Sequence, residues 1–172
     1  MTLEPEYHVK FFVPGIPAPG GSKTIFWNKT TGKSIVAPSC KRTKDWRSYV
    51  RFAALQAVEG RPPYGGPVWL VIDFVMPRPK SHFRTGKYAG ELKPDAPHWH
   101  IKQPDTTKLI RSTEDALKGI CWHDDSQVCW QVGMKFYCRQ TDHMGQTERI
   151  LASTGTFCMP GAHIDIQGIL CA

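Results

Sequence analysis

Residues 104–128 read PDTTKLIRSTEDALKGICWHDDSQV, and their pattern changes from helical to strand-like along the stretch. Apolar and small side chains recur three and four positions apart, which places them on one face of a helix. These side chains are Leu109, Ile110, Thr113, Ala116 and Leu117. Gly119 follows at the position expected of a helix end. The stretch therefore predicts a helix over residues 106–118 that leads into a strand.

Strand-like patterns surround this helix in the sequence. The nearly continuous apolar run VWLVIDFVM at 68–76 predicts a central strand. Residues 126–138 (SQVCWQVGMKFYC) alternate apolar with polar or small residues, which predicts a half-buried strand. Its apolar set is Val128, Trp130, Val132, Met134 and Phe136. The first and last strands are expected at 7–13 (YHVKFFV) and 163–170 (HIDIQGIL), whereas residues 139–161 carry no clear pattern.

A hairpin and another helix are expected before the central strand. The turn-like KTTG at 29–32 separates two short strand-like runs, which predicts a hairpin or an ordered flap. This element would carry the cations Lys23, Lys29 and Lys33. Thr43 is a suitable N-cap for a helix that ends near Gly60. The chain is therefore predicted to be a small α/β (α+β) fold, with a mixed β-sheet packed against two main helices, in one domain over residues 1–172.

The composition favours a soluble protein with an anionic partner. The chain is 41% hydrophobic and 22% charged, with a formal charge of +7, and this charge favours nucleic acid. The start MTLEPEYHVK lacks the apolar core of a signal peptide, and the longest apolar run is too short to cross a bilayer. We therefore expect a cytoplasmic protein with reduced cysteines, no membrane association and no small-molecule cofactor.

Residues 77–104 form a long segment without periodicity. The segment contains five prolines, six lysines or arginines and only two acids, with Phe83, Tyr88 and Trp99 among the cations. Aromatic residues between cations are typical of a nucleic-acid contact surface, and a solvated surface loop is the other interpretation. The DNA-binding candidates in the chain are Lys23, Arg78, Lys80, Arg84, Lys87, Lys93, Lys102 and Lys108.

The carboxylates of the opening stretch could support metal-dependent chemistry. Divalent cations such as magnesium (Mg2+) prefer carboxylate oxygens and promote phosphodiester hydrolysis. Asp105 starts the predicted helix, and Asp124 and Asp125 follow its end, about 20 Å away. Because residues 119–125 can span about 23 Å when extended, a return path could bring Asp125 to Asp105. The three aspartates are therefore candidate metal ligands.

Each of these acids also has a structural interpretation. Asp105 follows Pro104 and is a suitable N-cap for the helix. An Asp-Asp pair before a strand is typical of a solvated turn. Asp115 lies among cations on the polar face of the helix, where an ion pair with Arg111 is the simplest expectation. Spacing alone leaves both interpretations open.

The order and spacing of these residues resemble the signature of the RusA family of phage and prophage Holliday junction resolvases. That signature has the form P-D-x-D-N-L-x-K, then D-A-L, then D-D-x-Q-[VI] before a strand. The segment GIPAPGGSK at 15–23 is also similar to the family's proline-rich segment after its first strand, and the likeness covers most of residues 8–137. The matching signature residues are Pro104, Asp105, Leu109, Arg111, Asp115, Ala116, Leu117, Gly119, Asp124, Asp125, Gln127 and Val128.

The resemblance implies a RusA-like homodimer that nicks two opposed strands of a four-way DNA junction with Mg2+ or Mn2+. A twofold dimer suits the approximate twofold symmetry of the junction. Asp105 and Asp125 would be metal ligands supported by Asp124, and Arg111 would contact a phosphate in place of the family's lysine. Such an enzyme would be encoded by a phage or prophage and would act in DNA recombination and repair, in the cytoplasm of a bacterial host.

The sequence departs from the signature at two adjacent positions. Where the family has its second acid and an Asn, this chain has Thr107 and Lys108. Asp115, or less readily Glu114, could complete the metal site, or Thr107 could do so together with water. We expect an active nuclease of altered composition. The alternative is a protein that binds junctions or single-stranded DNA with a degraded metal site.

Overall fold

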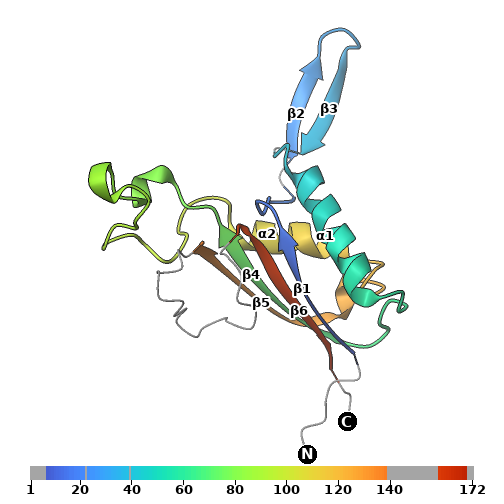
Figure 1. The fold of residues 1–172 in the computed structure, drawn as a ribbon. Helices are drawn as coiled ribbons and strands as arrows, with labels where there is room; N and C mark the ends of the chain where they lie inside the picture. Colours follow the sequence, from blue (N-terminus) through green and yellow to red (C-terminus); the bar gives the residue numbers. More distant parts are fainter. Residues whose placement is uncertain (1–6, 22, 39, 139–158, 170–172) are drawn as a thin grey trace, which may run out of the picture.

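The computed structural model describes residues 7–21, 23–38, 40–138 and 159–169. Figure 1 shows a four-stranded sheet with two helices on one face, and a separate two-stranded hairpin. This arrangement confirms the predicted mixed α/β fold with two main helices. The elements in chain order are β1 (His8–Pro14), β2 (Lys23–Asn28), β3 (Lys33–Pro38), α1 (Thr43–Val58), β4 (Val68–Met76), α2 (Thr106–Leu117), β5 (Val128–Tyr137) and β6 (Gly161–Gly168).

The sheet has the strand order β1-β6-β4-β5. β4 pairs antiparallel with β6 and parallel with β5, so the sheet is mixed. A parallel pair requires a crossover connection, and α2 lies in the crossover from β4 to β5. β4 is therefore an interior strand, as its apolar run predicts, and β5 is at the edge of the sheet.

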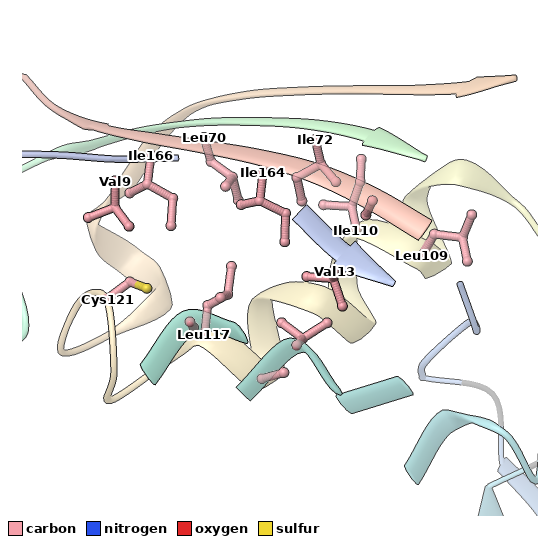
Figure 2. Close-up of a cluster of buried hydrophobic side chains, with 14 of the residues drawn as sticks. Val9, Val13, Leu70, Ile72, Leu109, Ile110, Leu117, Cys121, Ile164 and Ile166 are labelled. Carbon is pink, nitrogen blue, oxygen red and sulfur yellow. The ribbon is translucent and has the colours of Figure 1, made fainter. Parts of the chain in front are cut away.

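The core lies between the two helices and one face of the sheet (Figure 2). α1 and α2 are joined by a hydrogen bond, because the Trp46 indole N–H donates to the Thr113 hydroxyl over 3.3 Å. Core residues of the sheet include Val9, Val13, Leu70, Ile72, Ile164 and Ile166. The apolar face predicted for α2 is confirmed, because all five of its residues are buried: Leu109, Ile110, Thr113, Ala116 and Leu117.

α2 lies close to β5 because Gly133 has no side chain. A Cβ placed on Gly133 would lie 2.5 Å from Ile110 Cδ1. On the same face of β5, the Gln131 side chain donates a hydrogen bond to Glu114 of α2. α2 therefore covers the β5 face that carries Gly133 and Gln131.

The alternation of β5 does not mark a buried face, because Tyr137 is the one fully buried residue of this strand. Because alternate residues of a strand face opposite sides, Trp130 and Val132 point away from α2. Their side chains are 56% and 37% exposed. Trp130 contacts Trp69 of β4, with ring centroids 5.2 Å apart. The strand lies where the sequence predicts it, but its alternation marks the face that the helices leave uncovered.

α1 begins at Thr43 without the predicted cap. Arg42 occupies the N-cap position, and no side chain makes a capping hydrogen bond there. The Thr43 hydroxyl donates instead to the Pro19 carbonyl over 2.7 Å. Thr43 thus ties α1 to the loop that precedes the hairpin.

Within the described residues, no helix is both long and apolar enough to cross a membrane. The four cysteines described there are free, as expected: Cys40, Cys121, Cys129 and Cys138. Most of the segment 139–161, which has no clear sequence pattern, lies outside the described residues.

Candidate active site

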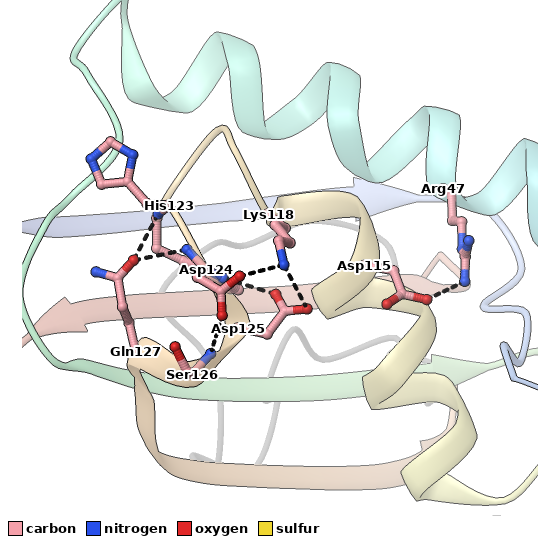
Figure 3. A network of polar contacts seen from close by, with 9 residues as sticks. Arg47, Asp115, Lys118, His123, Asp124, Asp125, Ser126 and Gln127 are labelled. Atoms are coloured by element: carbon pink, nitrogen blue, oxygen red, sulfur yellow. Dashed lines mark hydrogen bonds and ion pairs between the residues drawn. The ribbon is translucent and has the colours of Figure 1, made fainter.

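The C-terminal end of α2 carries the Asp-Asp pair. Directly after the helix the chain forms a tight coil, in which the Gly119 N–H donates to the Trp122 carbonyl over 2.7 Å. The coil keeps Asp124 and Asp125 beside the helix end (Figure 3). Lys118 Nζ lies 2.6 Å from Asp124 Oδ2 and 4.0 Å from Asp125 Oδ2. The two aspartates therefore gather around Lys118.

Backbone hydrogen bonds fix the Asp-Asp pair in place. Asp124 Oδ1 accepts from the Ser126 N–H over 3.1 Å, and Gln127 Oε1 accepts from the Asp124 N–H over 2.9 Å. These reciprocal contacts form a capping box on a short 3₁₀ helix. Gln127 Nε2 also donates to the carbonyls of Tyr64 and Gly66, over 2.9 Å each. Gln127 thus fastens the pair to the loop before β4.

The surface at this end of α2 is acidic. Asp125 Oδ1 accepts a hydrogen bond from the buried Trp122 indole over 3.2 Å. Hydrogen bonds from Lys118 and from a backbone N–H hold the pKa of Asp124 far below its usual range. Burial raises the pKa of Glu114, and the Asp125 charge adds to this effect. Carboxylate oxygens are the ligands that divalent cations prefer, but Lys118 already engages this pair.

Asp115 is held by a different helix from the one predicted. Its carboxylate forms an ion pair with Arg47 of α1. The expected pair with Arg111 is wrong, because Arg47 of the neighbouring helix reaches Asp115. The ion pair joins α1 to α2 and occupies the carboxylate that could otherwise have completed a metal site.

The N-terminal end of α2 carries Asp105 among cations. Asp105 occupies the N-cap position, but its side chain makes no capping hydrogen bond, so that structural interpretation is wrong for the carboxylate. Asp105 Oδ2 lies 2.9 Å from Lys108 Nζ. Lys135 of β5 lies nearby, since its Nζ donates to the Pro104 carbonyl over 2.6 Å. Burial lowers the pKa of Lys135, and the Asp105 charge opposes that shift.

A cavity of about 450 Å³ lies beside Asp105 and Lys108. Arg42 and His100 also line this cavity. Burial lowers the pKa of His100, which favours its neutral form. The cavity therefore combines a carboxylate with cationic side chains and an imidazole. Cations around an open cavity suit a phosphate group.

The two acid groups lie at opposite ends of α2. Asp105 and Lys118 flank the 12 residues of α2 and lie about 20 Å apart along its axis, and Asp125 lies beside Lys118. The predicted return of Asp125 to Asp105 within one chain is therefore wrong, because residues 119–123 coil at the helix end. In the part of the chain that the structure describes, no group of three or more His, Cys, Asp or Glu side chains could hold a metal ion. One chain alone does not fit the expected cation.

The outer side of α2 connects the two ends. Thr107, Arg111 and Lys118 are exposed there, and Glu114 is half-buried beside them. Arg111 passes close to the loop before the hairpin, since a Cβ on Gly21 would lie 3.3 Å from Arg111 Cδ. This side of the helix is accessible to another macromolecule.

The segment 77–104 is more ordered than a plain loop. It contains short 3₁₀ helices at Lys80–His82 and Gly86–Tyr88. Arg84 stacks on Tyr88, with 3.9 Å from Arg84 Cζ to the ring centroid. The exposed DNA-binding candidates of this segment are Lys80, Lys87, Lys93 and Lys102.

The remaining DNA-binding candidates are placed differently. Arg78 donates to the Pro97 carbonyl over 2.8 Å and also to the Cys138 carbonyl, which gives it a structural role in this segment. Lys108 faces Asp105, and Lys23 lies at the start of β2. The predicted cations are therefore spread over the hairpin, the segment 77–104 and the N-terminal end of α2.

Two lysines of the site, Lys118 and Lys135, were not predicted as site residues from the sequence. Lys118 holds both aspartates, and its place at the C-cap of a helix, where cations are favoured, was an available signal. Lys135 lies in the middle of a strand, and nothing in its spacing points to Asp105. Only the parallel pairing of β5 with β4 brings it to the helix start.

Similarity to known proteins identifies the family of this chain. Among curated proteins, no match was found. The sequence profile of a family described as endodeoxyribonuclease RusA matches residues 17–143. The matched span contains the hairpin, both helices, both ends of α2 and, apart from Ile16, the lining of the cavity beside Asp105. Because the match covers well over half of the chain, this protein belongs to the RusA family of endodeoxyribonucleases.

Proposed function

We propose that the protein is a structure-selective endonuclease that resolves four-way DNA junctions as a homodimer with Mg2+ or Mn2+. Family membership supports the nuclease activity. The resemblance to phage and prophage resolvases supports a role in DNA recombination and repair within a bacterial host. The observation that carries the dimeric site is the separation of Asp105 from Asp124 and Asp125 by the length of α2.

The ends of α2 are complementary in charge. The Asp105 end carries Lys108, Lys135 and the cavity, whereas the other end carries the acids around Lys118. A twofold axis across the middle of two antiparallel α2 helices exchanges their ends. It would bring Asp125 of the partner subunit to the Asp105 end. Such an axis pairs each cationic end with an acidic one, and electrostatic complementarity of this kind favours association.

The sequence positions along α2 agree with this axis. Asp105 and Lys118 flank α2 at equal distances from its middle, so Asp105 would face Lys118 of the partner subunit. Because Lys118 holds Asp124 and Asp125, these carboxylates of the partner subunit would approach the Asp105 end, two residues before Thr107. A carboxylate would then approach Thr107, where the family signature asks for an acid. Arg111 would contribute to the dimer contact as well as to phosphate binding.

Each group has a role in this assembled site. Asp105 and Asp125 of the partner subunit would hold the divalent cation, which supplies an activated water and charge stabilisation at the phosphate. Lys108 and Lys135 would bind the phosphate next to the cavity. Asp124 would position Asp125 through Lys118 and the capping box. Two such sites related by a twofold axis suit two opposed junction strands.

A cleavage assay tests the activity. The protein is incubated with a synthetic four-way junction and Mg2+, and with a duplex of the same sequence as control. We expect paired nicks in the junction that disappear with EDTA and with Asp125→Asn. Junctions that stay intact with the wild-type protein would contradict the nuclease proposal.

Mixed dimers test the shared site. Asp105→Asn and Asp125→Asn subunits are each expected to be inactive, and they are mixed so that subunits exchange. If the site is shared, each mixed dimer has one site with both substitutions and one site with neither. Equal amounts of the two subunits make about half of the dimers mixed, so about a quarter of the wild-type nicking activity should return. If all ligands came from one subunit, mixing would restore nothing.

A second function, junction binding without cleavage, is favoured by one observation. Lys108 occupies the Asp105 carboxylate at 2.9 Å, where the family signature has a neutral Asn, and Thr107 replaces an acid. This function predicts junction binding that survives EDTA and weakens steeply with salt, with no nicks at any Mg2+ or Mn2+ concentration. Binding that needs the cation would exclude it.

A further inference from the structure

The β2–β3 hairpin is a separate arm of the molecule. Its two strands form their own sheet and do not pair with the four-stranded sheet. Figure 1 shows the hairpin projecting away from the body of the domain. Two-stranded hairpins are marginally stable in water by themselves. Exposed apolar side chains on such an arm therefore indicate that the arm contacts a binding partner.

The turn of the arm is well built. The Asn28 side chain accepts hydrogen bonds from the Thr30 N–H over 2.9 Å and from the Thr31 N–H over 3.2 Å. The Gly32 N–H donates to the Asn28 carbonyl over 2.9 Å, and Gly32 has a φ of 61°, which favours glycine. The turn thus presents a fixed surface at the end of the arm.

The arm combines exposed apolar residues with positive charge. Ile25 and Trp27 are 69% and 64% exposed, and they lie two positions apart on one face of β2. The span 23–38 contains three lysines and no acid. Exposed aromatic residues among cations are the composition that stacks on unpaired bases while holding the phosphate backbone. A protein partner would require no such excess of positive charge.

The base of the arm lies beside the candidate active site. The Gly20 N–H donates to the Lys108 carbonyl of α2 over 2.8 Å. Pro19 lines the same cavity as Asp105 and Lys108. The arm therefore starts at the end of α2 that carries the cavity and can reach DNA next to a phosphate bound there.

We propose that Trp27 and Ile25 form a stacking surface for DNA bases that are unpaired or exposed at a branch point. This inference rests on the proposed function and adds a basis for its structure selectivity. A duplex hides the faces of its bases, whereas a branch point exposes them. Lys29 and Lys33, exposed near the turn of the arm, hold the adjacent phosphates of either substrate, and the stacking surface adds affinity for branched DNA alone.

The test measures the binding of Trp27→Ala and Ile25→Ala to a four-way junction that contains 2-aminopurine beside the branch point. A duplex is the second substrate. Phe52→Ala is the matched control, because Phe52 is 68% exposed on α1. We expect Trp27→Ala to lose about 5- to 150-fold in junction affinity and to lose the 2-aminopurine response, with duplex affinity unchanged. Trp27→Phe should keep most of both, and Phe52→Ala should bind like the wild type.

The outcomes separate this inference from the proposed function. If the wild-type protein cuts junctions but Trp27→Ala and Ile25→Ala bind them normally, the stacking surface is refuted and the nuclease stands. Equal losses on duplex and junction would also refute it. A wild-type protein that binds no branched DNA would overturn both proposals. The thermal unfolding midpoint of each variant shows whether a loss comes from the fold.

Discussion

The two ends of α2 differ in how firmly their carboxylates are held. At the C-terminal end, Asp124 and Asp125 are fixed by Lys118, and Gln127 completes a capping box that is fastened to the loop before β4. At the N-terminal end, Asp105 has only an exposed ion pair with Lys108 beside an open cavity. The carboxylates at the C-terminal end are therefore preorganised, whereas the N-terminal end leaves room for a ligand.

This difference indicates a division of work between the two ends. Preorganised acids hold a cation with little reorganisation, and an open cationic cavity admits a phosphate. Among the described residues, neither end has a group of three or more His, Cys, Asp or Glu side chains that could hold a metal ion, and about 18 Å of helix separates the ends. The comparison therefore favours a site assembled from two subunits over a site that forms within one.

The largest effect is expected from removing one acid at either end. Asp105→Asn and Asp125→Asn should each reduce junction nicking by about 100- to 1,000-fold, because each deletes a charge that acts on the reacting phosphate. Asp115→Asn is the control, since Asp115 is engaged by Arg47. Nicking rates under single-turnover conditions measure the effect. A loss with Asp115→Asn equal to the other two would mean that the metal site lies elsewhere on α2.

The next largest effect is expected from moving α2 against β5. Gly133→Ala places a Cβ 2.5 Å from Ile110 Cδ1 and should destabilise the fold by about 1–3 kcal/mol. The displaced helix should also weaken nicking, since Lys135 of β5 lies near Asp105 at the helix start. Urea unfolding measures the stability.

The double variant Gly133→Ala/Ile110→Ala is the control for this contact. It removes the clash and should cost less than the sum of the two single changes, because the two residues are in contact. Strictly additive costs would show that Ile110 and Gly133 do not set the distance between α2 and β5.

A smaller effect, visible in the pH dependence, is expected from Lys118→Met. The Lys118 contact lowers the pKa of Asp124 in the folded protein. The stabilisation of the folded protein by this contact is fully present above the pKa that Asp124 has in the unfolded chain. It is lost as the pH falls through the lower pKa that Asp124 has in the folded protein. Without Lys118 the pKa of Asp124 rises, so the acid limb of the nicking profile should move to higher pH. Lys118→Arg should keep the wild-type profile, and an unshifted limb in Lys118→Met would mean that Asp124 does not support the site.

The sequence is informative where a pattern is local. The periodicity around Leu109 and Leu117 predicts both the position and the buried face of α2, and the apolar run at 68–76 predicts an interior strand. In β5 the same argument identifies two faces but not which one is covered. Trp130 and Val132 are exposed because α2 packs where Gly133 permits it.

The site is less predictable because its contacts are tertiary. Asp115 pairs with Arg47, which is 68 positions away, so spacing within α2 could not reveal its partner. The length of residues 119–125 when fully extended is only an upper limit on the distance that they span. In the structure these residues turn back at Gly119 and span much less. If two subunits share the site, as proposed, no distance within one chain could predict it.

The smallest effect is expected from adding an acid to the open end of α2. Thr107→Asp restores the carboxylate of the family signature at an exposed position, one turn before Arg111. If the hydroxyl faces the assembled site, the new oxygen ligand should lower the Mg2+ concentration for half-maximal nicking by a few-fold, on the order of 1 kcal/mol. Thr107→Ser keeps a hydroxyl and should behave like the wild type. An unchanged Mg2+ dependence in Thr107→Asp would place residue 107 outside the metal site, and Asp105 with Asp125 of the partner subunit would then have to hold the cation without it.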